Sequence, residues 1–338
     1  MLTGSMERML DRRNFLVGFT ASLLTAPLAA DAQQAGKAYR IGILSPFSRS
    51  FGPAPSFEAF RQTLRELGYV DGRNVVFEYR WADGRDDRLP VLAAELIRTR
   101  VDVIFSAWGT PTALATKKAT SSVPIVFAGV GDAVGVGLVA SLARPGGNAT
   151  GSTFITEETV AKQLELLKAV APRASRVAVV VNPGNPVYGP MLRASEAPAR
   201  ALGLDLAVVA IQRAEDLEGA FAAAIHDRVD GLVVGRDTVL QLNRVRLVAL
   251  AASHRLPAVY GMRAFVEGGG LMSYGPDLAE TYSRAAYLID KILRGAKPAD
   301  VPVEQATKFE FVLNLKTAKT LGLTVLPSLQ LRADRVVE

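Results

Sequence analysis

The sequence predicts an α/β protein built from two doubly wound, Rossmann-like lobes. Short apolar runs alternate with amphipathic stretches after Lys37, and the breaker cluster 144–148 divides this pattern into two halves. Each half begins with a strand, a loop rich in Pro, Gly or Ser, and a long helix. Continuous apolar strands separated by helices indicate parallel sheets that are covered on both faces. Short, right-handed crossovers then give the doubly wound order.

The expected strands are short runs of apolar residues that end at polar, Gly or Pro positions. In chain order they are Arg40–Leu44, Val75–Tyr79, Val103–Phe105, Ile125–Phe127, Val177–Val181, Leu206–Ile211, Gly231–Val234, Ala258–Tyr260 and Leu271–Ser273. The stretches between them have the helical period of hydrophobic residues. The expected helices are Ser56–Leu67, Leu89–Thr99, Pro111–Ala119, Glu157–Val170, Gly189–Leu202, Ala214–Ile225, Gln241–His254 and Leu278–Leu293.

The N-terminus has the layout of a bacterial export signal. Arg12 and Arg13 precede an apolar stretch that ends near Leu28, and a small-x-small site follows at 30–32. The stretch is shorter than the roughly 20 residues that span a bilayer, so we expect a signal peptide over residues 1–32 that is cleaved near Ala32. The mature protein is then periplasmic. The paired arginines leave Sec and Tat export both open, and a buried N-terminal helix is the alternative to a signal.

Composition excludes several classes of function. Cleavage would leave about 306 of the 338 residues, enough for two lobes. The absence of cysteine and the presence of only two histidines exclude disulfides, thiolate chemistry and a histidine-rich metal centre. The net charge of +6 is scattered, which is typical of a solvated surface and not of a nucleic-acid partner.

Catalytic motifs are also missing from the sequence. There is no G-x-S-x-G, H-E-x-x-H, P-loop or C-x-x-C pattern, so we expect no enzyme, no cofactor and no metal. An exported protein also cannot draw freely on cytoplasmic ATP or NADH. Asp83, Asp86 and Asp87 share a polar loop with two arginines, and we interpret this loop as solvated and not as a calcium site.

Ligands of open α/β sheets bind beyond the carboxyl ends of the strands, so the loops there hold the candidate site. In the first half these loops contain Ser45, the run Trp108-Gly109-Thr110, and Asp132. With Pro111 as the first helical residue, Thr110 is expected to be the N-cap, and the free N–H groups there suit a carboxylate. Asp132 follows glycines and suits an ammonium group; a simple helix cap is the alternative for both residues.

The second half places further polar or aromatic residues at strand ends. They are Asn182, Asp237, Tyr260, Ser273 and Tyr274. Together with Trp108, the two tyrosines are expected to provide flat apolar walls for a planar ligand, although aromatic residues in such lobes also serve as core.

Several longer segments resemble one family. They are Phe60–Tyr69, Asn74–Ala82, Gly129–Gly135, Leu142–Asn148, Leu271–Gly275 and Asn314–Lys319. The chain is similar to ABC-transporter substrate-binding proteins related to the tryptophan/tyrosine-binding type. The resemblance implies the type I periplasmic-binding-protein fold, with lobes joined by a hinge. Lobe 1 would comprise residues 38–150 plus about 275–305, and lobe 2 would comprise 151–274 plus about 306–338.

The expected function is therefore capture of a small solute in the cleft between the lobes and its delivery to an ABC permease in the inner membrane. The resemblance suggests an amino acid, including an aromatic one, or another small carboxylate. A sensory protein that serves a membrane kinase and an exported enzyme of sugar or nucleotide chemistry are the alternatives. The second alternative is weakened by the missing nucleophile, base and metal ligands.

Overall fold

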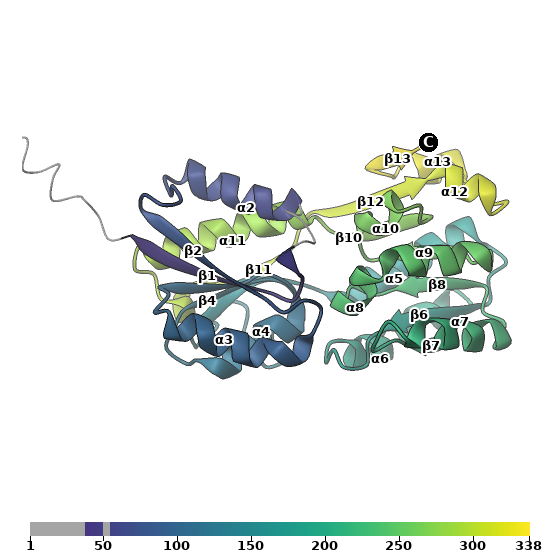
Figure 1. The fold of residues 1–338 in the computed structure, drawn as a ribbon. Coiled ribbons are helices and arrows are strands. Elements are labelled where there is room, and N and C mark those ends of the chain that lie inside the picture. Colours follow the sequence, from purple (N-terminus) through teal and green to yellow (C-terminus); the bar gives the residue numbers. More distant parts are fainter. Residues whose placement is uncertain (1–37, 50–54) are drawn as a thin grey trace, which may run out of the picture.

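Two separate β-sheets organise the chain, each at the centre of one lobe (Figure 1). The structure is a computed structural model that describes residues 38–49 and 55–338. The predicted export signal and its cleavage site lie outside these residues. The first sheet has the strand order β11-β5-β4-β3-β1-β2, and the second has the order β13-β12-β10-β9-β8-β6-β7. No helix within the described ranges is long and apolar enough to cross a membrane.

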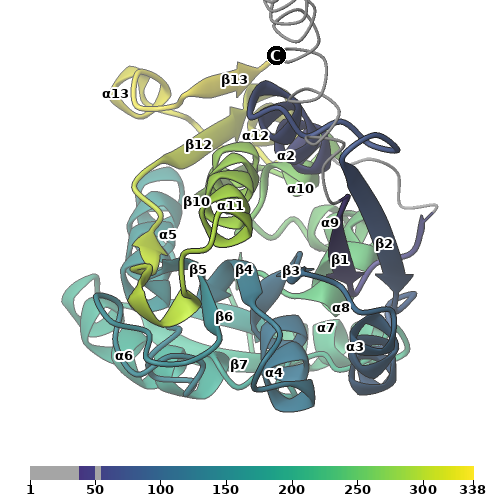
Figure 2. The same ribbon diagram turned by 90° about the vertical axis from the view of Figure 1, so that its left-hand side faces the viewer.

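The first lobe consists of a parallel sheet between two layers of helices. Its strands are β1 (Tyr39–Ser45), β2 (Val75–Trp81), β3 (Val103–Ser106), β4 (Ile125–Gly131), β5 (Ala149–Phe154) and β11 (Glu304–Gln305). Its helices are α2 (Pro55–Glu66), α3 (Leu89–Arg98), α4 (Gly109–Ala119) and α11 (Leu278–Leu293), with short 3₁₀ turns η2 (Asp86–Arg88) and η3 (Pro298–Asp300). The amphipathic helices α2 and α11 lie side by side on one face, and α3 and α4 cover the other (Figures 1 and 2).

The second lobe repeats this arrangement. Its strands are β6 (Arg176–Val181), β7 (Asp205–Ala210), β8 (Gly231–Val234), β9 (Ala258–Tyr260), β10 (Met272–Pro276), β12 (Phe309–Asn314) and β13 (Arg335–Val337). Its helices are α5 (Thr156–Val170), α6 (Tyr188–Ala201), α7 (Asp216–His226), α8 (Thr238–Leu242), α9 (Arg244–Ser253), α10 (Arg263–Glu267), α12 (Leu315–Thr320) and α13 (Pro327–Gln330). The apolar strand β6 is buried almost throughout, as a strand covered on both faces must be.

The chain passes between the two lobes three times. The passages lie between β5 and α5, between β10 and α11, and between β11 and β12. Helix α11 and strand β11 therefore belong to the first lobe, although they lie in sequence between β10 and β12 of the second sheet (Figure 1).

Several short elements (β11, β13, α10, α12 and α13) are not among those predicted, and three larger features also differ from the prediction. Strand β12 pairs antiparallel with β10, because the chain leaves the second lobe after β10 and re-enters it in the opposite direction, so this sheet is mixed. The helix expected over Gln241–His254 is two helices, α8 and α9, which meet at Asn243. Strand β5 was not foreseen, because its sequence Ala149–Phe154 is rich in small and hydroxyl residues.

Candidate functional site

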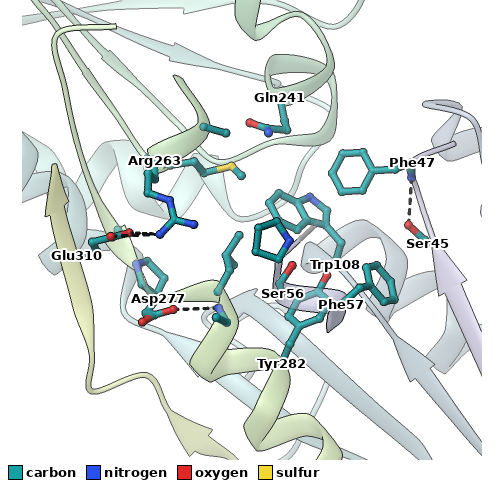
Figure 3. A pocket seen from close by; sticks show the side chains of 18 of the residues that line it. Ser45, Phe47, Ser56, Phe57, Trp108, Gln241, Arg263, Asp277, Tyr282 and Glu310 are labelled. Atoms are coloured by element: carbon teal, nitrogen blue, oxygen red, sulfur yellow. Dashed lines mark hydrogen bonds and ion pairs between the residues drawn. The ribbon is translucent and has the colours of Figure 1, made fainter. Parts of the chain in front are cut away.

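A large cavity lies between the two lobes, next to the segments that connect them. It measures about 1000 Å³, including space that is open to solvent. Its aromatic lining comes mainly from the first lobe: Phe47, Phe57, Trp81, Trp108 and Tyr282 (Figure 3). The second lobe contributes Gln241, Gly261, Met262, Arg263, Glu267 and Glu310, and the connection between β10 and α11 closes one side.

The aromatic wall of this cavity is held by ring-to-ring packing. The Phe47 and Trp108 rings meet edge to face at 5.0 Å, and Phe57 meets Tyr282 at 5.3 Å in the same way. The Tyr282 hydroxyl donates to the Ala107 carbonyl, and burial raises the pKa of this tyrosine well above its ordinary value, so it stays neutral. Phe47 and Trp108 also belong to a hydrophobic cluster of the second lobe, so the lobes share apolar contact here.

The charged side chains of the large cavity neutralise one another. Arg263 is 3.3 Å from a Glu310 carboxylate oxygen and 3.0 Å from one of Glu267. Asp277 caps α11 by accepting from the Ala279 N–H at 2.9 Å, and Lys308 donates to it at 2.7 Å. Burial would raise the pKa of Asp277, but the bonds from Lys308 and the backbone outweigh it and lower the pKa.

One polar group of the large cavity is left without a partner. Gln241 is buried, and its side-chain oxygen has no hydrogen-bond partner among the described residues. Because an unpaired buried amide is unfavourable, this side chain is suited to a polar atom of a ligand.

A second, smaller cavity adjoins the first and shares Trp108 with it. It measures about 330 Å³, again including open solvent. The first lobe supplies the start of α4 at Gly109 and Thr110, the glycines of β4 and Phe154; the second lobe supplies Asn185, Arg236, Asp237 and Thr238. Gly109 and Gly129 both have φ of +65°, a conformation that favours glycine and that exposes the backbone to a ligand.

The structure places five of the residues predicted from the sequence at these cavities. Ser45 lines the large cavity, Gly109, Thr110 and Asp237 line the small one, and Trp108 lines both. One detail of the prediction was wrong: the N-cap of α4 is Trp108, not Thr110, because the left-handed Gly109 already begins the helix. Thr110 is instead buried in the first turn.

Asp237 is a well-bonded N-cap of α8. Its carboxylate accepts from the Val239 N–H at 2.9 Å and from the side-chain amides of Asn182 at 3.1 Å and Asn185 at 3.2 Å. Burial raises the pKa of Asp237 against the lowering effect of these bonds. Asn182 thus serves to hold Asp237 and is not among the residues that line the two cavities.

The other predicted residues lie elsewhere. Asp132 has a positive φ of 44° and accepts from the Gly135 N–H in its own turn at 2.9 Å. Tyr260 is stacked on Phe265 in the core of the second lobe, and Ser273 is buried within β10. Tyr274 stacks on Phe309 at 5.5 Å, outside the lining of both cavities.

Phe57, Gln241, Tyr282 and Asp277 are among the site residues that sequence reasoning misses. They lie at helix starts or on helix faces, and only the packing of one lobe on the other turns them toward the cavity. The sequence does indicate a role for Asp277, because this residue directly precedes the helix predicted at 278 and is an expected N-cap.

The loop that was interpreted as solvated contains one enclosed carboxylate. The Asp86 side chain has a buried Oδ1 with no hydrogen-bond partner in the described ranges. Burial, together with repulsion from Asp237 of the second lobe and from Asp87, raises the pKa of Asp86 to about 6. Its neighbours Arg85 and Arg88 pair with Asp87 and Asp83 instead.

Two Rossmann-like lobes that are joined by three chain passages and enclose a cleft define the class of two-lobed binding proteins. The chain belongs to the ABC transporter substrate binding protein family, whose family model matches residues 54–337.

Several known proteins are similar to it. A tyrosine-binding protein of Clostridioides difficile is 26% identical over 266 residues, which cover 79% of this chain and 76% of that protein. The structure of an ABC domain in complex with L-Trp from Streptococcus pneumoniae has a TM-score of 0.82 and 26% identity, and the match covers 89% of this chain and all (100%) of that one. A leucine-binding protein, LivK, of Thermotoga maritima shares the fold at a TM-score of 0.55 and 15% identity, covering 78% of each chain. The predicted type I periplasmic-binding-protein fold is thereby confirmed.

Proposed function

We propose that this protein is the solute-binding component of an ABC importer and that it captures an amino acid or closely related small carboxylate between its lobes. The observation that carries the proposal is the aromatic cavity at the lobe interface, lined from both sides. Similar proteins are described as binding tyrosine and L-Trp, and a planar side chain suits the wall formed by Phe47, Phe57 and Trp108. The protein binds its solute without transforming it.

Lobe closure is the proposed mechanism. The three passages between lobes act as the hinge, and the lobe that carries the first sheet moves against the lobe that carries the second. Because the site draws residues from both lobes, a ligand makes all its contacts only in the closed form and therefore favours that form. The ABC permease of the inner membrane then recognises the closed form.

The ligand's carboxylate lies in the small cavity at the start of α4, where the backbone N–H groups and the helix dipole favour an anion. Its planar body lies along Trp108 in the large cavity, where the oxygen of Gln241 accepts from a ligand N–H. Ser45 completes the first-lobe side of the site.

The protein acts in the periplasm after cleavage of residues 1–32. N-terminal sequencing of periplasmic protein should give Gln33 or a neighbour as the first residue. Protein that retains the signal in the periplasm contradicts this part of the proposal.

The function is tested by identifying a retained solute and by measuring closure. Native mass spectrometry of freshly purified protein should reveal a bound small molecule, and small-angle scattering should show a smaller radius of gyration when that molecule is added to the stripped protein. Tight binding with an unchanged radius would refute closure. Conversion of the solute on incubation would refute a purely binding role.

A further inference from the structure

Arg236 is an enclosed cation that no acidic residue in the described part of the chain pairs with. The residue follows β8 and lines the small cavity. Its Nε and Nη1 atoms are shielded from solvent and have no hydrogen-bond partner within residues 38–49 and 55–338. Burial lowers the pKa of the guanidinium to about 10, which still leaves it charged at neutral pH.

The surroundings of the guanidinium are aromatic and glycine-rich. Its central carbon lies 5.4 Å from the ring centre of Trp108 and 4.7 Å from that of Phe154, both in the first lobe. Such cation–π contacts stabilise a cation by less than it costs to bury an unpaired ion. The contacts orient the guanidinium and leave its Nε and Nη1 donors without a partner among the described residues.

Two glycines make room for this side chain. A Cβ at Gly261 would lie 2.5 Å from the Cγ of Arg236, so only glycine lets the stem pass. A Cβ at Gly129 would lie 3.4 Å from Nη2, so the left-handed backbone of β4 lies close to the guanidinium. The Arg236 backbone is also fixed, because its carbonyl accepts from the buried Tyr188 hydroxyl at 2.6 Å.

The start of α4 supplies further donors to the same cavity. Helix α4 spans Gly109–Ala119, and no side chain bonds to its N-terminal N–H groups at the cap. Gly109 and Thr110 line the cavity together with Arg236. The positive potential in the small cavity therefore comes from both lobes, from the N-terminus of α4 and from Arg236.

Among the described residues that line the small cavity, no carboxylate with a free oxygen competes for this charge. Asp237 is the acidic residue in the lining, and both of its oxygens already accept hydrogen bonds, from Asn182, Asn185 and Val239. The cavity offers donors to an anion and no comparable acceptor to an ammonium group.

We propose that the small cavity is a carboxylate subsite whose counter-ion is Arg236, so that the solute is selected by its carboxylate and does not need an α-amino group. The inference rests on the proposed binding function and deepens it. Arg236 pairs with the carboxylate through its planar N–H donors, and the apolar body of the solute extends along Trp108 into the large cavity.

The test compares probes that differ in charge, four of them built on the same indole ring. Acetate, benzoate, indole-3-propionate, L-tryptophan, indole and tryptamine are titrated by calorimetry up to about 10 mM, where a millimolar Kd gives nearly full occupancy. The carboxylates should bind, L-tryptophan and indole-3-propionate with similar affinity, and tryptamine should bind no better than indole. Failure of all four carboxylates, or preference for tryptamine, overturns the inference.

Substitutions of Arg236 test whether its charge is what binds the carboxylate. Arg236→Met should weaken carboxylate binding roughly 10²-fold or more and leave indole binding unchanged. Arg236→Lys should keep the preference for carboxylates at reduced affinity, since Lys lacks the planar donor pair. The ligand-free Met variant should be no less stable than the parent, because an unpaired buried charge is removed. Arg246→Gln, which removes an exposed charge paired with Glu218 in the same lobe, is the matched control and should change none of these.

Equal carboxylate affinity in Arg236→Met and in the parent overturns the subsite. The two proposals can fail separately. Carboxylate binding through Arg236 without compaction in scattering contradicts the importer mechanism and keeps the subsite. If instead a retained solute compacts the protein and binds Arg236→Met as tightly as the parent, the subsite is contradicted and the importer function stands.

Discussion

Replacing Asp86 by Asn should stabilise the protein at neutral pH and have little effect in acid. The reason is that Asp86 is a poorly solvated carboxylate. Its pKa is raised from 3.8 to about 6 by burial first, and then by the facing Asp237 and the adjacent Asp87. Ionised Asp86 therefore repels Asp237 of the other lobe and opposes the arrangement that brings the two carboxylates together.

The sign follows from proton linkage. The folded protein binds this proton more tightly than the unfolded chain, so the stability from Asp86 is fully present below about pH 4 and is lost as the pH rises toward 6. A difference of about two pKa units corresponds to about 3 kcal/mol at most. Because the side chain is partly exposed, we expect about 1–2 kcal/mol.

The assay is urea unfolding followed by circular dichroism at pH 4 and pH 7.5, each with the parent, Asp86→Asn and Glu218→Gln. The control Glu218 is exposed and bonded to Arg246, which lowers its pKa, and it does not act on Asp86, so its replacement should not stabilise at either pH. An Asp86→Asn variant that is destabilised at pH 7.5, or equally affected at both pH values, would refute the reasoning.

Three further predictions follow from local packing. Gly261→Ala should weaken carboxylate binding, measured by calorimetry, because the added Cβ would force the Arg236 stem aside; unchanged binding would contradict this. Gly219→Ala lies in α7 with nothing within 4 Å of the added Cβ, so it should stabilise the protein by roughly 0.5–1 kcal/mol in urea unfolding. Asp237→Ala should lower the free energy of unfolding by about 2–4 kcal/mol, since it removes the α8 cap and leaves the Asn182 and Asn185 amides buried without their acceptor. A denaturation midpoint equal to that of the parent would show that these bonds contribute nothing.

The sequence determined the parts of the fold that depend on local periodicity. Helix α11 has the predicted bounds, Leu278–Leu293, because its apolar face repeats at helical spacing and Asp277 caps it. The buried strands β6 and β8 also lie where apolar runs predicted them. Strand β12 escaped prediction, because its pairing partner β10 lies more than thirty residues away and the chain crosses to the other lobe between them.

The sequence also brought the start of α4 and Asp237 into consideration, since the carboxyl ends of parallel strands gather at one edge of a sheet. Only the tertiary structure decided which polar residues are satisfied and which are not. Asp237 and Arg236 are neighbours in the chain, yet the carboxylate of the first is fully bonded, while Nε and Nη1 of the second lie between Trp108 and Phe154 with no hydrogen-bond partner in the described part of the chain. Burial and missing partners depend on how one lobe lies against the other, and no local pattern carries that information.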